Sequence, residues 1–289
     1  MASEYNFKNK VIVITGASQG IGKTIAIEFS KQHAHVIICA RTQKDLDQTK
    51  HEIEMQGGYC DAYRVDVSQY DEVHNFFNSV VKENKKIDAL ICCAGIYGPL
   101  GSVDINDMQQ WKKTIEVNLL GTVYCVHEAL ISMKKNKCGK IITLCGGGVG
   151  GNNIKPNLSA YISSKGAIAL FIEVIAQEVL TNNIQINAIS PGAVNTRLLD
   201  EVLSSGDLVD HSFLDAAKKQ KEGGGTPPQK AAELCLFLAS EKSDGITGKL
   251  ISAVWDPLND LLKHQDELIN SDIYTLRRIT PKDHHKDRK

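Results

Sequence analysis

The sequence has almost no net charge and lacks the pattern of a secretory leader. Its 33 basic and 34 acidic residues leave a formal net charge of −1, so no overall field attracts nucleic acid. The N-terminal stretch 1–9 has no apolar core of a signal peptide, and no stretch approaches the length and purity of a membrane span. We therefore expect a cytoplasmic protein with no nucleic-acid or membrane partner.

The sequence also lacks cysteine pairs with a regular spacing. Its eight cysteines are scattered, and several lie inside apparent strands, among them Cys39, Cys92, Cys93 and Cys145. No pair has the spacing of metal ligands, so no metal site is expected, and thiols buried in strands argue against disulfides. The cysteines indicate a reducing compartment. No internal repeat and no linker divides the first 250 residues.

What is present begins with a short apolar run, residues 10–15, that leads directly into glycines. The run is rich in β-branched residues, as is typical of a buried parallel strand. Gly16 permits a tight turn, Gly20 lets the backbone approach a pyrophosphate, and Gly22 lets the next helix pack closely on the strand. Amides at the start of that amphipathic helix, 23–32, then face the phosphates. The order predicts a dinucleotide site; the alternative is an ordinary glycine-rich turn.

Strand-like and helical patterns alternate along the chain. Strands are expected at 10–15, 36–40, 59–65, 87–93, 140–145, 184–189 and 249–254, with prominent helices at 107–133 and 160–180. Such alternation predicts an α/β fold: a single-domain, Rossmann-type, doubly wound parallel sheet of about seven strands flanked by helices. Ligands of such sheets bind at the carboxyl ends of the strands.

Tyr161 and Lys165 are four residues apart, so on a helix their side chains share one face. An ammonium about 4 Å from a phenolate contributes roughly 4 kcal/mol at an effective dielectric of about 20. That interaction brings a phenol pKa, ordinarily about 10, close to neutrality. The pair therefore predicts an acid/base group, although such pairs also arise by chance on many helices.

Together these motifs resemble a known family. Thr15-Gly16-x-x-x-Gly20-x-Gly22, Val117-Asn118-Leu119, Tyr161-x-x-x-Lys165 and Pro191-Gly192 occur in the order and approximate spacing of the short-chain dehydrogenase/reductase family. The resemblance covers roughly residues 7–254. It implies one dinucleotide-binding and catalytic domain, 1–254, a nicotinamide cofactor, and hydride transfer to or from a carbon–oxygen bond. Residues 255–289 form an extension beyond that domain.

The resemblance also implies roles for individual residues. Tyr161 is the proton donor or acceptor, Lys165 lowers its pKa and holds the nicotinamide ribose, and Asn118 holds a water that links Lys165 to solvent. The cofactor-binding positions it implies are Gly16, Ser18, Gln19, Gly20, Ile21, Gly22, Arg41, Asp66, Val67, Ala94, Gly95, Tyr161, Lys165, Pro191, Gly192, Val194 and Thr196.

The end of the second expected strand bears on the choice of cofactor. It reads Ala40-Arg41-Thr42, with no acidic residue before Asp45. A basic residue there pairs with a 2′-phosphate, whereas an acidic one holds ribose hydroxyls. Arg41 therefore predicts NADP(H) rather than NAD. The alternative is a solvated arginine, with specificity set elsewhere.

Two segments depart from the family pattern. Cys92-Cys93-Ala94-Gly95 stands where the family has Asn-Asn-Ala-Gly, and we interpret the thiols as small core residues. The stretch after the fifth strand has Cys145 or Gly146 where the family has a catalytic serine. Losing such a donor typically costs about 10²–10³ in rate. We hypothesise that Cys145 marks the catalytic position and that amides of 146–148 replace the hydroxyl. The alternative is a cofactor-binding protein with a regulatory or scaffold role.

The remaining sequence predicts the substrate side and the assembly. Residues 197–225 are expected to form a substrate lid with a hinge at 223–228, and the substrate is a small carbonyl or alcohol, with a sugar or nucleotide sugar as one option. An amphipathic segment is expected at 258–269 and a disordered charged end at 282–289. Apolar faces on the helices 107–133 and 160–180 predict a homodimer or homotetramer.

Overall fold

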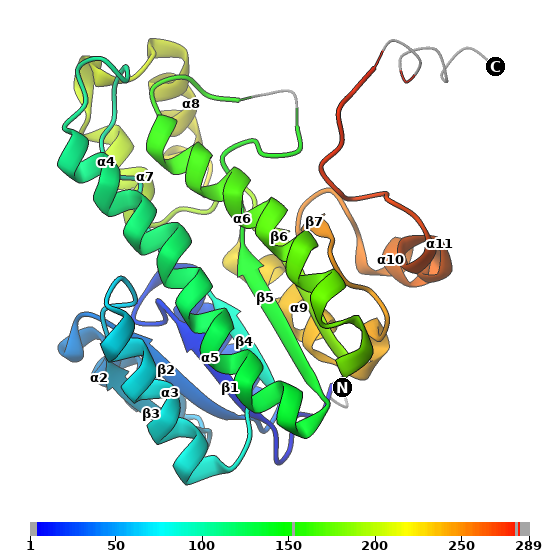
Figure 1. The fold of residues 1–289 in the computed structure, drawn as a ribbon. Helices are drawn as coiled ribbons and strands as arrows, with labels where there is room; N and C mark the ends of the chain where they lie inside the picture. Colours follow the sequence, from blue (N-terminus) through cyan, green and yellow to red (C-terminus); the bar gives the residue numbers. More distant parts are fainter. Residues whose placement is uncertain (1–4, 152–153, 281–282, 284–289) are drawn as a thin grey trace.

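The computed structural model describes residues 5–151, 154–280 and 283. Its centre is a parallel sheet in the order β3-β2-β1-β4-β5-β6-β7, with helices on both faces (Figure 1). The strands are β1 Val11–Thr15, β2 His35–Ala40, β3 Tyr59–Arg64, β4 Ala89–Cys92, β5 Gly139–Leu144, β6 Ile184–Ser190 and β7 Leu250–Ser252. The predicted fold class is confirmed, and each predicted strand is present.

The helices follow the strands in the predicted alternation. They are α1 Gly20–Lys31, α2 Gln43–Met55, α3 Tyr70–Asn84, α4 Met108–Ile115, α5 Gly121–Asn136, α6 Ser159–Glu178, α7 Arg197–Leu203, α8 His211–Glu222, α9 Pro228–Ala239, α10 Leu258–Lys263 and α11 Gln265–Asn270. The helix expected at 107–133 is interrupted by a π-helical turn, η1 Glu116–Leu120. Such turns inside helices frequently occur at functional sites, and this one carries Asn118.

The sheet is apolar on both faces. In β1, Ile12 and Ile14 pack in one core cluster with residues of α1 and α9, whereas Val11 and Val13 pack in the other with residues of α3, α5 and α6. Double coverage explains why the strand reads as a continuous apolar run. β1 and β4 are neighbours, and successive strands are added outward from them in opposite directions. A crevice therefore opens at the carboxyl ends of these two strands.

One described helix, α6, is long and apolar enough to cross a membrane, with a mean hydropathy of 1.4. The sequence-based statement that no stretch approaches a membrane span is therefore wrong for this segment. The helix packs on β6 and buries Ile168, Ala169 and Ile172 in the core. The core helix of a globular protein passes the same composition test.

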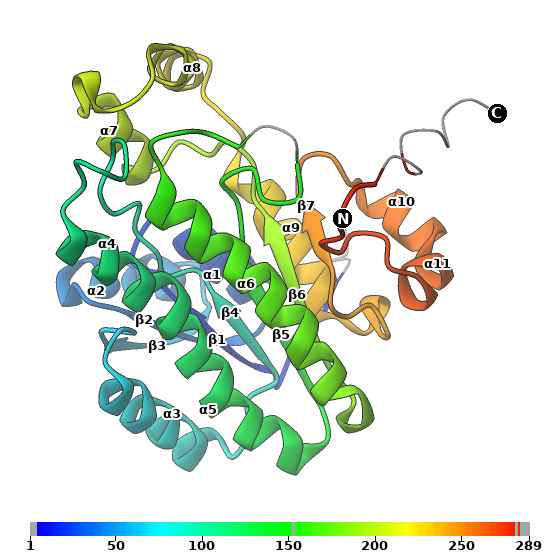
Figure 2. The same ribbon diagram turned by 45° about the horizontal axis from the view of Figure 1, so that its top comes forward.

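The extension and the segment 197–225, which was expected to form a lid, lie at different places on the molecule. The short helices α10 and α11 lie beside α9 and β7, whereas α7 and α8 lie beyond the carboxyl ends of the strands (Figures 1 and 2). The amphipathic segment expected at 258–269 corresponds to α10 and α11. The charged end 282–289, expected to be disordered, lies outside the described residues except for Asp283.

Candidate active site

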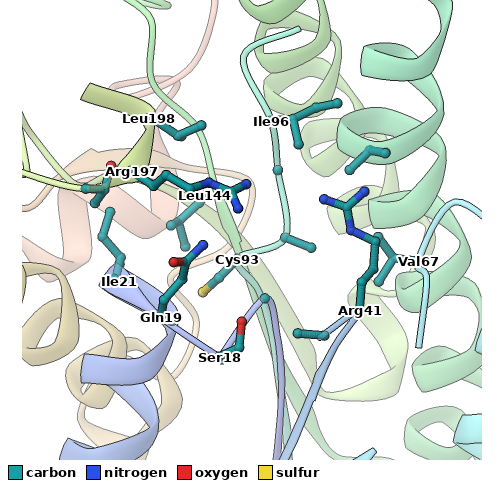
Figure 3. A pocket seen from close by; sticks show the side chains of 18 of the residues that line it. Ser18, Gln19, Ile21, Arg41, Val67, Cys93, Ile96, Leu144, Arg197 and Leu198 are labelled. Carbon is teal, nitrogen blue, oxygen red and sulfur yellow. The ribbon is translucent and has the colours of Figure 1, made fainter. Parts of the chain in front are cut away.

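A cavity of about 460 Å³ occupies the crevice at the carboxyl ends of the strands. It runs from Arg41 at the end of β2, past the glycine turn after β1, to Tyr161 and Lys165 on α6. Figure 3 shows Arg41 and Arg197 extending into this cavity from opposite walls. The chain thus brings most of the predicted site residues to one place.

The glycine turn after β1 is tight enough to exclude any larger residue. A β-carbon at Gly16, whose φ is +65°, would lie 2.7 Å from the backbone N and Cα of Ala94. At Gly22 it would lie 2.5 Å from the carbonyl oxygen of Gly16. Gly20 has a φ of +56° and faces Thr196. The turn is therefore pressed between α1 and the segment after β4. The Gly16 and Ala17 amides donate to the Cys39 carbonyl, and residues 18–22 line the cavity wall, where a diphosphate meets the start of the helix.

The far end of the cavity carries both a cation and carboxylates. The exposed Arg41 extends beside Val67 (Figure 3). Burial works against ionisation of Asp66, but hydrogen bonds from the hydroxyl and amide of Ser68, together with Lys113 and Arg41, hold its pKa below the usual value. Asp45 also lines this end, a position to which the sequence reasoning gave no role.

Tyr161 and Lys165 lie together, but not with the predicted electrostatics. The Lys165 Nζ donates to the carbonyl oxygen of Leu144 at 2.9 Å and lies 5.7 Å from the centre of the Tyr161 ring. Burial raises the pKa of the Tyr161 phenol, and Tyr97 and Cys145 raise it further. Burial likewise lowers the pKa of the Lys165 ammonium. The predicted shift of the phenol pKa toward neutrality is therefore wrong for this structure, because desolvation dominates and the Lys165 ammonium donates to the Leu144 carbonyl instead.

Asn118 is fully buried, and its side-chain amide is committed to protein partners. The Oδ1 accepts from the Ile96 amide at 2.8 Å, and the Nδ2 donates to the Ile96 carbonyl at 2.9 Å and the Ser164 hydroxyl at 3.0 Å. These bonds tie the segment after β4 to α6. A β-carbon at Gly95 would lie 3.3 Å from Asn118 Oδ1 and 3.6 Å from Lys165 Nζ. The glycine therefore allows both groups to approach the backbone.

The position that faces the Tyr161 hydroxyl is Gly146 rather than Cys145. The Cys145 side chain is buried and donates to the carbonyl oxygen of Lys165 at 3.3 Å, and burial raises its pKa. A β-carbon at Gly146, whose φ is +151°, would lie 3.5 Å from the Tyr161 hydroxyl. One at Gly147 would lie 3.2 Å from Cε1 of the same ring. A glycine turn thus covers the tyrosine where a side chain would otherwise contact its oxygen.

Several sequence-based assignments fall elsewhere. Of the predicted cofactor positions, Gly192 and Val194 do not line the cavity, whereas Gly16, Ser18, Gln19, Gly20, Ile21, Gly22, Arg41, Asp66, Val67, Ala94, Gly95, Tyr161, Lys165, Pro191 and Thr196 do. With a φ of +83°, Gly192 packs beside Val254 and Thr226. It shapes the loop that delivers Pro191 and Thr196 to the cavity.

Sequence reasoning missed the charged residues that α7 and α8 contribute. Arg197, Asp200 and Lys221 all line the cavity. The Lys221 Nζ contacts Asp200 Oδ1 at 2.7 Å, an ion pair that joins α7 to α8. Arg197 could have been predicted, because it directly follows Thr196, a position that was expected to bind the cofactor. The ion pair was not, because its partners are 21 residues apart.

A doubly wound sheet, a glycine turn at the switch point, and a partly buried tyrosine beside a buried lysine define a nucleotide-dependent oxidoreductase. The profile of the short chain dehydrogenase family matches residues 10–206. The chain belongs to this family.

Individual relatives agree with this assignment. The chain is 31% identical over 246 residues to the short-chain reductase protein NovJ of Streptomyces niveus, which covers 84% of this chain and 92% of that protein. Its fold is similar to that of NAD⁺-bound xylitol dehydrogenase, with a TM-score of 0.79 and 23% identity over 85% of this chain and 98% of the other. It is also similar to actinorhodin polyketide ketoreductase with NADPH, with a TM-score of 0.76 and 24% identity over 84% and 95% of the two chains.

Proposed function

We propose that the protein is an NADP(H)-dependent oxidoreductase that interconverts a secondary alcohol and a ketone, with Tyr161 as the acid/base. The observation that supports this most directly is the position of Tyr161 and Lys165. They stand at one end of a cavity whose wall contains the glycine turn and whose other end contains Arg41. A dinucleotide lying along that wall places its reactive end at the tyrosine.

The residues present fit such a cofactor. Gly16 and Gly22 form a cradle that a β-carbon would fill, and the amides at the start of α1 are placed to bind a diphosphate. The nicotinamide supplies or accepts the hydride when it is bound. The protein's own part is to hold the ribose through Lys165 and to move a proton at the substrate oxygen through Tyr161. Because burial raises its pKa, the phenol carries the proton that reduction requires, and it is a weaker acid than a phenol with a pKa near neutrality would be.

The preference for NADP(H) is testable at Arg41. We expect Arg41→Ala to weaken NADPH binding by about 10–100-fold, because charge-assisted hydrogen bonds to a phosphate contribute roughly 1.5–3 kcal/mol. NADH binding should change by less than about twofold, since NADH has no 2′-phosphate. Fluorescence titration of both cofactors measures the difference. Arg64→Ala is the matched control, an exposed arginine at the end of β3 that does not line the cavity. Equal losses for NADPH and NADH would refute the assignment.

The missing serine leads to a second prediction. We propose that backbone amides of residues 146–148, rather than a side chain, donate to the substrate oxygen. Because the Cys145 side chain points to the Lys165 carbonyl, Cys145→Ser and Cys145→Ala should each change kcat by less than about threefold, well below the 10²–10³ typical of an oxyanion donor. A rise of tenfold or more in kcat for Cys145→Ser alone would show that a hydroxyl at 145 reaches the substrate.

The proposed function itself requires a substrate. NADPH binding is measured by fluorescence, and NADPH oxidation is then followed with a panel of small ketones, ketosugars and nucleotide sugars. The expected result is cofactor binding with turnover of at least one carbonyl compound. Cofactor binding without turnover of any of them would instead favour a regulatory or scaffold role. The observation in favour of that alternative is Gly146, which brings no hydroxyl to the face of Tyr161.

A further inference from the structure

The segment after α11 returns to the sheet and lies along β7. We call residues 271–277 the C-terminal arm. The Leu250 amide donates to the Tyr274 carbonyl at 2.7 Å. The Lys249 Nζ donates to the carbonyls of Ser271 at 2.6 Å and Ile273 at 3.0 Å. The arm is therefore fixed to the sheet by its backbone, and not only by loose surface contacts.

The arm is also fixed to the helix that carries the catalytic pair. The carboxylate of Glu173 on α6 accepts from the Leu276 amide at 2.8 Å through one oxygen. It accepts from Nη1 of Arg277 at 2.8 Å through the other. The Glu173 side chain is only 17% exposed, which strengthens a charge-assisted pair relative to a solvated one. Since Glu173 lies two helical turns beyond Lys165, the arm and the catalytic side chains share one rigid element.

A second glycine-rich turn, residues 146–151, follows β5. Leu276 extends from the arm to this turn. A β-carbon at Gly150, whose φ is +80°, would lie 3.1 Å from Leu250 Cδ2 and 3.7 Å from Leu276 Cδ2. Leu276, Leu250 and Val149 are partly buried against the same core cluster. The apolar end of the arm thus lies against the turn at Gly150, at the opposite end of the turn from Gly146 and Gly147, which face Tyr161.

The near end of the turn touches Tyr161 at Gly146 and Gly147. Glycines have the widest backbone freedom of any residue, so a turn of this composition holds its own shape only weakly. Inside the turn, the Val149 amide donates to the Gly146 carbonyl at 3.4 Å and the Gly151 amide to the Gly148 carbonyl at 3.0 Å. Tyr161 at one end and the arm at the other restrict the turn further. We propose that the C-terminal arm positions the glycine turn over Tyr161, with Leu276 and Arg277 as positioning residues. This inference rests on the proposed function, because it assigns the turn to the substrate oxygen.

Kinetics of two arm variants test the proposal. We expect Leu276→Ala and Arg277→Ala to lower kcat about tenfold, because a misplacement of about 1 Å at the reacting groups costs up to about 10²-fold in rate. The dissociation constant for NADPH should stay within about twofold, because none of the arm residues 271–277 lines the cavity. Leu262→Ala is the matched control, a leucine of the same extension that is 40% exposed. Equal losses in all three variants, or a loss confined to NADPH binding, would overturn the proposal.

Hydrogen exchange tests the same inference without any substrate. Amides of residues 146–151 should exchange at least about tenfold faster in Leu276→Ala and in Arg277→Ala than in the wild-type protein, since local opening sets their protection. Amides of α1 and β1 should be unchanged. Arg277 is 53% exposed, so its variant is expected to fold even if the leucine variant does not. Unchanged exchange at 146–151 in a folded variant would refute the positioning role. Faster exchange in a protein with no carbonyl turnover would refute only the proposed function.

Discussion

Tyr161→Phe is expected to lower turnover by about 10³-fold, within the 10²–10⁴ that a positioned proton donor typically contributes. The substitution removes one oxygen and keeps the ring, which packs edge-to-face on Tyr97 with the ring centres 4.7 Å apart. Cofactor binding should therefore stay within about twofold, because the glycine turn and Arg41 are untouched. Steady-state kinetics with the best carbonyl substrate and NADPH titration measure the two effects separately.

Tyr97→Phe is the control that this geometry provides. Burial raises the pKa of Tyr97 as it does that of Tyr161, and the two rings pack edge-to-face. Because it lies on the loop after β4 rather than beside Lys165, its hydroxyl is expected to contribute less than about tenfold to the rate. Equal losses in the two variants would assign the proton transfer to the pair of phenols. A loss in Tyr97→Phe alone would move the acid/base role away from Tyr161.

Gly22→Ala is expected to weaken cofactor binding by about 10²-fold or more. Its β-carbon would lie 2.5 Å from a backbone oxygen of Gly16 and 3.1 Å from Cα of Ala17, so α1 or the turn must shift by several tenths of an ångström. Losing two amide–phosphate hydrogen bonds at roughly 1.5–3 kcal/mol each corresponds to about 10²-fold weaker binding or more. Overpacking should also lower the free energy of unfolding by about 1–3 kcal/mol. Cofactor titration and urea denaturation measure both quantities.

Gly166→Ala separates this steric effect from a general effect of replacing a helical glycine. A β-carbon at Gly166 on α6 would meet no atom within 4 Å. The variant should bind cofactor normally and gain about 0.5–1 kcal/mol of stability, because alanine loses less entropy in a helix than glycine. Normal cofactor affinity in Gly22→Ala would mean that the close packing of α1 on β1 is not required for the dinucleotide site.

The sequence was sufficient to predict the sheet and the position of most cavity residues. Continuous apolar runs such as that ending at Thr15 have few alternatives to a buried parallel strand, and the glycine spacing that follows is specific in that context. Since parallel strands bring their carboxyl ends to one edge, motifs as distant as Gly16 and Tyr161 were correctly predicted to share a crevice. The parallel sheet and the position of its crevice can therefore be predicted from local sequence patterns.

The sequence could not provide the pKa shifts, which depend on burial, or the directions in which side chains point. The sign of the Tyr161 pKa shift was wrong, because spacing gives the distance to Lys165 but not the loss of water around both groups. Cys145 and Gly146 are adjacent, so the sequence alone could not tell which one faces the Tyr161 hydroxyl. The ion pair between Asp200 and Lys221 depends on how α7 and α8 pack.

The pairing of Leu250 with Tyr274 has a consequence for self-association. β7 is the last strand in the sheet order, and an open outer strand is a template to which a second polypeptide can add. Here the chain's own backbone already occupies that template at Leu250. Another copy approaching from this side meets the C-terminal arm at Leu250 instead of a free strand edge, which disfavours growth of the sheet across molecules at this position.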